Sequence, residues 1–72
     1  MNELIERALE LEKALLMLER SNGDLQSAAD QEQDGSEEHR FYLDCINENN
    51  ELMERKRTEV AELRQAIEKM KH

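Results

Sequence analysis

Apolar side chains recur at alternating intervals of four and three residues in two long runs of the chain. The first run comprises Leu4, Ala8, Leu11, Leu15, Leu18, Asn22, Leu25 and Ala29. The second run comprises Tyr42, Ile46, Asn49, Met53, Lys56, Val60, Leu63, Ile67 and Met70. This spacing is typical of the seam of a heptad helix, so the sequence predicts two long amphipathic helices and an all-α fold.

A turn signal separates the two runs, at Asp34-Gly35-Ser36-Glu37. Asp34 is predicted to cap the second helix, with Glu37 in a capping box, and Gly35 permits a tight reversal. We therefore expect a single domain over residues 1–72, with helix one over about 2–33, a turn at about 34–36 and helix two over about 36–71. A competing signal at Gly23 would end the first helix early and leave a short third segment.

The two runs share one register if the chain reverses at Gly35. Facing residues then have numbers that add up to about 71, and every layer of the two runs fits this rule. Asn22, the only polar residue of the first run, faces Asn49 of the second. Because a buried asparagine pair fixes register, we predict a long antiparallel hairpin of the coiled-coil type. Its arms should be on the order of 50 Å long.

Further apolar residues widen the seam of each helix. They are Ile5, Leu9, Leu16 and Met17 in the first helix, and Phe41, Leu43, Cys45, Leu52 and Ala66 in the second. A widened apolar stripe indicates a helix that packs against more than one neighbour. We therefore expect the hairpin to form a homodimer, a four-helix bundle that includes the Leu-rich seam. The alternative is a monomeric hairpin on which single apolar residues are exposed.

Negative charge is concentrated where the hairpin turns. Residues 24–54 carry ten acidic side chains against one base, Arg40, while the chain as a whole carries a net charge of −8. The tip of the hairpin therefore carries −9, which could meet a basic or groove-like protein surface and excludes direct nucleic-acid binding there. The alternative is that these acids only keep a small helical protein in solution.

The sequence contains no recognisable catalytic, cofactor-binding or metal-binding motif. His39 and His72 are the only histidines, and neither belongs to a helical metal-ligand pair. The single cysteine, Cys45, is interpreted as a packing residue. With no Trp, no Pro, one Tyr and one Phe, the chain lacks the residues that a sheet-based enzyme needs. We expect a cytoplasmic protein without enzymatic activity, cofactor or membrane segment.

The leading functional hypothesis is a small acidic protein-binding module. It would act as a homodimeric regulator or inhibitor that covers a surface of a larger protein, for example as an antagonist of a host protein that a phage or other mobile element encodes. The candidate partner-binding residues are Ile5, Leu9, Leu16, Met17, Asp34, Glu37, Glu38 and Phe41. The alternatives are a structural coiled-coil spacer in a larger assembly and, third, a nucleic-acid mimic that uses the acidic tip.

Overall fold

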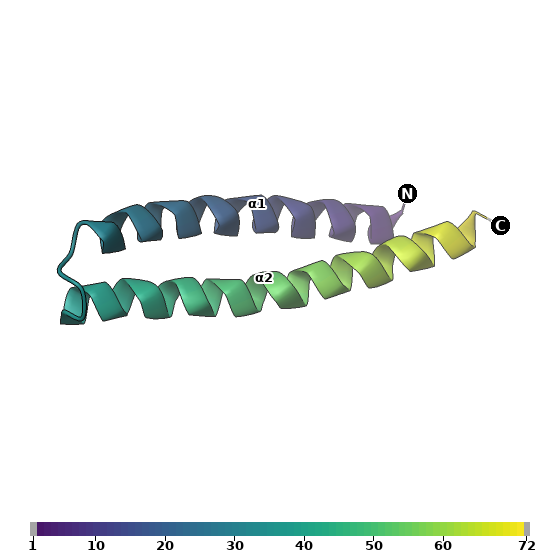
Figure 1. Ribbon diagram of the computed structural model, residues 1–72. Coiled ribbons are helices and arrows are strands. Elements are labelled where there is room, and N and C mark those ends of the chain that lie inside the picture. Colours follow the sequence, from purple (N-terminus) through teal and green to yellow (C-terminus); the bar gives the residue numbers. More distant parts are fainter. Residues whose placement is uncertain (1, 72) are drawn as a thin grey trace.

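The computed structural model describes residues 2–71, which form two long helices joined by a short connection. Helix α1 spans Glu3–Asp30 and helix α2 spans Glu37–Met70. The helices run antiparallel, so both ends of the chain lie at the same end of the molecule (Figure 1). The molecule measures 56 × 15 × 12 Å. The predicted all-α antiparallel hairpin is thus confirmed.

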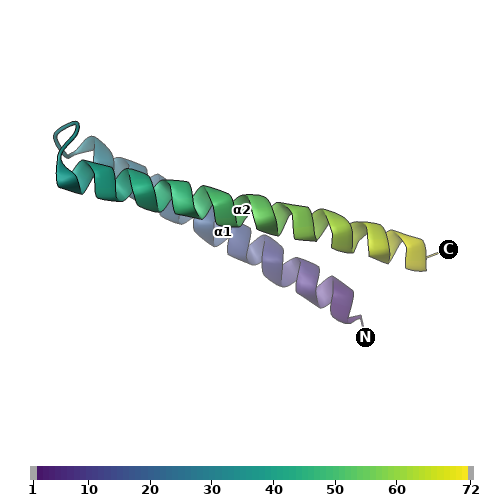
Figure 2. The same ribbon diagram turned by 90° about the horizontal axis from the view of Figure 1, so that it is seen from below.

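The two helices cross at a shallow angle. In the view of Figure 2 they overlap near the connection and separate toward the other end of the molecule. We call this other end, where α1 begins and α2 ends, the open end. Within residues 2–71, neither helix carries a long enough apolar stretch to cross a membrane.

Each helix begins at a polar cap. The side chain of Asn2 accepts a hydrogen bond from the Leu4 amide at 3.0 Å, and that of Ser36 accepts one from the His39 amide at 3.1 Å. The prediction that Asp34 caps α2 is therefore wrong. A capping side chain must directly precede the first helical residue, and Asp34 lies two positions before Ser36. Gly35 supplies the reversal, because its φ of 79° lies in the left-handed region.

Helix α1 ends at Asp30, three residues before the predicted end. The amides of Gln31 and Glu32 close the last turn onto the carbonyls of Ala28 and Ala29. Asp30, Glu32 and Asp34 occupy alternate positions at this end of the helix, and the last turn contains no basic residue. Acidic side chains are unfavourable at the negative end of a helix dipole, which explains the early termination.

The core lies in one layer between the helices. Its buried residues are Ala8, Leu11, Ala29, Met53 and Val60. The remaining predicted seam residues are half-buried, except Met70, which is exposed at the open end. The Asn49 side-chain amide donates to the Asn22 side-chain oxygen at 2.9 Å, so the register in which facing numbers add up to about 71 is confirmed.

Helix α1 continues without a break through Gly23. Replacing this glycine with alanine should raise the free energy of unfolding by about 1 kcal/mol, because glycine is a poor helix former. A methyl group there would meet no atom within 4 Å. Thermal unfolding followed by circular dichroism should show a Tm increase of roughly 4–8 °C. Gly35→Ala is the matched control and should lower the Tm, because φ at Gly35 disfavours any side chain. A lower Tm for Gly23→Ala would mean that α1 bends at this residue.

Candidate functional site

The seam between the helices has two edges, and charged side chains close one of them. The Arg64 guanidinium pairs with the Glu12 carboxylate, and Arg57 lies 3.7 Å from Glu19. On the same side, the side-chain amide of Asn22 donates to the Asn50 side-chain oxygen at 2.9 Å. We call this side of the hairpin the ion-pair edge. Its pairs are exposed, so they contribute little stability, but their long side chains cover the seam.

The opposite edge is lined mainly by short side chains. Two polar contacts define it, Arg7 with Glu59 at 3.0 Å and the Asn49 amide with the Ser21 hydroxyl at 3.5 Å. Residues at seven-residue spacing from these positions share their side of each helix. They are Ala14 and Ala28 in α1, and Cys45, Leu52 and Ala66 in α2. All are half-buried except Leu52, which is 42% exposed. We call this side the apolar edge.

The outer face of α1 carries three large exposed apolar side chains. Leu9, Leu16 and Met17 are 60%, 66% and 65% exposed. Leu16 lies four residues after Glu12, so the two leucines adjoin the ion-pair edge. Met17 lies three residues after Ala14 and adjoins the apolar edge. The prediction of one flank that includes Met17 is therefore wrong, because consecutive helical residues point about 100° apart.

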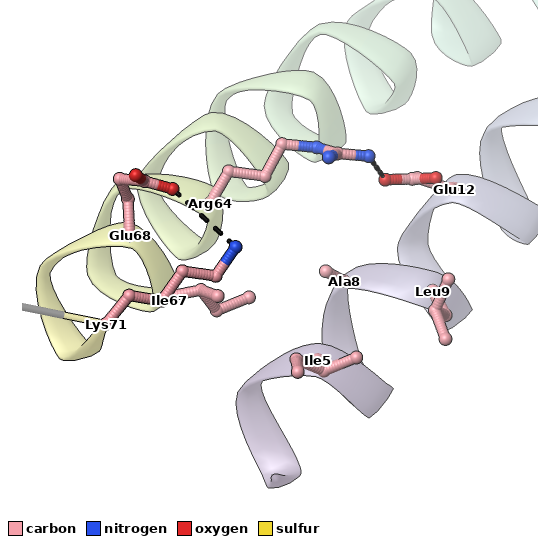
Figure 3. A pocket seen from close by; sticks show the side chains of 8 residues that line it. All are labelled: Ile5, Ala8, Leu9, Glu12, Arg64, Ile67, Glu68 and Lys71. Carbon is pink, nitrogen blue, oxygen red and sulfur yellow. Dashed lines mark hydrogen bonds and ion pairs between the residues drawn. The ribbon is translucent and has the colours of Figure 1, made fainter.

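A shallow hollow of about 240 Å³ extends from Leu9 to the open end. It is lined by Ile5, Ala8, Leu9, Glu12, Arg64, Ile67, Glu68 and Lys71. In Figure 3, Ala8 points toward α2, whereas Leu9 points away from it. The hollow therefore joins the predicted residues Ile5 and Leu9 into one surface beside the ion-pair edge.

The outer face of α2 differs from that of α1. It is almost entirely polar and carries exposed acidic residues along its length, among them Asp44, Glu48, Glu51 and Glu54. Its large apolar exception is Phe41, which is 62% exposed near the tip and stacks edge to face on Tyr42, with ring centroids 5.8 Å apart.

The acidic tip is organised around the start of α2. Asp34, Glu37 and Glu38 are all exposed. Arg40, the single base of residues 24–54, directs its guanidinium to the Gly35 carbonyl oxygen, at 3.1 Å from Nη2. His39 accepts a hydrogen bond from the Gly35 amide at its Nδ1, and its Nε2 lies 3.7 Å from Asp34. The strong negative charge of the tip therefore faces solvent.

Sequence reasoning missed the side chains that flank the seam. The heptad pattern did not predict four side chains that make contacts across the seam, although the register places them next to their partners. They are Ser21, Asn50, Arg57 and Arg64. Ion pairs across an antiparallel seam join residues whose numbers add up to about five more or five less than those of the facing pairs. That offset was the available signal for Arg57 and Arg64.

Residues 2–71 contain no group of three His, Cys, Asp or Glu side chains placed to hold a metal ion. Cys45 is a free, half-buried thiol, and His72 lies outside the described residues. The prominent features are therefore surfaces: the leucine pair of α1, the apolar edge and the acidic tip.

Comparison with known proteins adds a family. The model of the TMA17 helical domain matches residues 1–71. No curated protein and no solved structure matches the chain. The family match covers both helices and the connection between them.

Proposed function

The chain belongs to the TMA17 helical domain family, and we propose that it is a non-enzymatic protein-binding module that regulates or inhibits a larger protein by covering one of its surfaces. The observation that carries this proposal is the leucine pair of α1. Leu9 and Leu16 lie seven residues apart on one face, and each is at least 60% exposed. Neither side chain contributes to the core of the hairpin.

Transfer of these leucines into a partner would be favourable. Burying one leucine side chain fully is worth roughly 1.5–3 kcal/mol. Two leucines one heptad apart on a rigid helix are the kind of anchor that a hydrophobic groove accepts. Lys13 and Arg20 flank Leu16 and form no ion pair within the described part of the chain. The proposed groove therefore has an acidic rim.

The acidic tip is a second candidate surface. It is favoured by the engagement of Arg40 with the Gly35 carbonyl, which leaves the carboxylates of Glu37 and Glu38 facing solvent. A basic protein face would be the partner of this surface.

The free thiol of Cys45 supports the cytoplasm as the compartment, since reduced cysteines persist there.

Affinity capture from nuclease-treated cell lysate, with the wild type compared with charge variants of the chain, tests the leucine pair against the tip. We expect the wild type to retain a stoichiometric larger protein, and Leu9→Glu/Leu16→Glu to lose it more than tenfold, because a carboxylate cannot enter an apolar groove. Met70→Glu is the matched control, because Met70 is 65% exposed but lies on α2, outside the leucine pair and the hollow beside Leu9. Circular dichroism should show unchanged helix content in every variant.

The remaining outcomes separate the alternatives. Loss with Glu37→Lys/Glu38→Lys alone would assign the interaction to the acidic tip. No retained protein with any variant would contradict the binding module and favour the structural spacer.

A further inference from the structure

We propose that a second copy of this chain packs on the apolar edge, with the two hairpins antiparallel and their two-fold axis near Met17 and Leu52. The product is a four-helix bundle. This surface differs from the leucine pair, which stays accessible to a partner protein.

The exposed area of the elongated hairpin is large enough for one face to be covered by another body. The chain exposes 5726 Å². A compact monomer of 8.5 kDa exposes only about 4,700 Å². The excess is on the order of 1,000 Å², and each partner of a standard stable interface contributes about 800 Å². Covering one long face of the hairpin would bring the exposed area to an ordinary value.

The apolar edge is the face suited to close helix packing. Apart from the Arg7–Glu59 ion pair toward the open end, the side chains that line it are mainly alanines, a serine and a cysteine, so a neighbouring helix can approach closely along the rest of the edge. Met17 and Leu52 add large exposed apolar side chains. Both lie near the middle of their helices, so a two-fold axis through the centre of the face brings each next to its own equivalent. The ion-pair edge offers charged side chains along the same stretch.

The distribution of charge selects a second copy and its orientation. Ten of the eighteen acidic residues lie in residues 24–54 at the tip, whereas nine of the ten basic residues lie outside this range. Parallel hairpins would place two tips of −9 side by side. Antiparallel hairpins place each tip beside the remaining residues of the other copy, whose nine bases and eight acids give a net charge of +1, so this orientation avoids the repulsion between tips.

Full overlap in this orientation gives Phe41 a neighbour. The position opposite Phe41 is close to Ala66 of the second copy, where a methyl group leaves room for a ring. Glu38 then lies near Lys69 of the second copy. These pairings connect the exposed phenylalanine near the tip with the small residue near the open end.

Sedimentation equilibrium of the purified full chain tests the surface. We expect a mass of about 17 kDa, twice the 8.5 kDa of one chain. Met17→Glu and Leu52→Glu should each weaken dimerisation at least tenfold, and Leu16→Glu should leave it unchanged. All three side chains are exposed, so the hairpin itself stays folded, which circular dichroism verifies. A monomer at every concentration, or sensitivity to Leu16→Glu instead of Met17→Glu, would overturn the proposal.

Disulfide trapping tests the orientation. In a Cys45→Ser background, Met17→Cys should form a disulfide-linked dimer on mild oxidation, because the two positions meet at the axis. The wild type should not, because antiparallel packing places the two Cys45 residues about 25 Å apart along the bundle, at 1.5 Å per residue. Rapid trapping of wild-type Cys45 without trapping at position 17 would show that the two Cys45 residues meet and would refute the antiparallel arrangement. Disulfide trapping needs no partner protein, so it tests the dimer independently of the proposed function.

Discussion

Leu11→Ala should lower the free energy of unfolding of the hairpin by about 2–5 kcal/mol. Leu11 is 3% exposed and faces the buried Val60 across the seam. Truncation of a buried leucine to alanine costs about 2–5 kcal/mol, because it removes apolar contacts and leaves a cavity. A domain of 72 residues has a total stability of only about 4–11 kcal/mol. Because the core is a single layer, truncation of one residue can remove a large part of the free energy of unfolding of this hairpin.

Urea unfolding followed by circular dichroism at 222 nm measures this effect, at a fixed protein concentration because self-association shifts stability. Leu16→Ala provides the matched control, since the same truncation at a 66% exposed site should change the unfolding free energy by less than about 0.5 kcal/mol. Equal effects at the two positions would show that the seam between α1 and α2 is not the core.

Asn22→Leu/Asn49→Leu should stabilise the hairpin while weakening its single register. In the native protein, the Asn22 oxygen accepts from the Asn49 amide at 2.9 Å, and the Asn22 amide donates to Asn50 at 2.9 Å. Two leucines in this layer bury more apolar surface and need no hydrogen bonds, which should add about 1–3 kcal/mol to the unfolding free energy. Without the asparagine layer, the seam disfavours a shift by one heptad less strongly.

The single variant Asn22→Leu separates the two effects. Asn49 then retains only the longer contact with the Ser21 hydroxyl, at 3.5 Å, and an unsatisfied amide costs about 1–3 kcal/mol. We therefore expect the single variant to be less stable than the double variant. A two-dimensional amide NMR spectrum should show one set of signals for the wild type and doubled or broadened signals for the double variant. A sharp single set in the double variant would show that leucine packing alone fixes the register.

The α1 boundary and the α2 cap illustrate how far sequence patterns reach. The heptad spacing identified both helices, and the asparagine positions identified their register, because these features depend on period and polarity. The α1 end at Asp30 and the Ser36 cap were missed. Several residues near the turn can serve as caps, and which of them does so depends on where the backbone leaves the helix.

The amino-acid sequence by itself determined that the chain is an all-α hairpin and that its tip is strongly acidic. It also determined which side of each helix faces the other helix. These properties follow from the positions of apolar and charged residues along a helix of known period. Only the tertiary structure decided how the two edges differ. The angular position of Leu16 and Met17 relative to α2 separates these neighbours onto opposite sides. Side-chain contacts across the seam then close one edge with Arg57 and Arg64 and leave the other lined mainly by small residues, with the Arg7–Glu59 pair toward the open end.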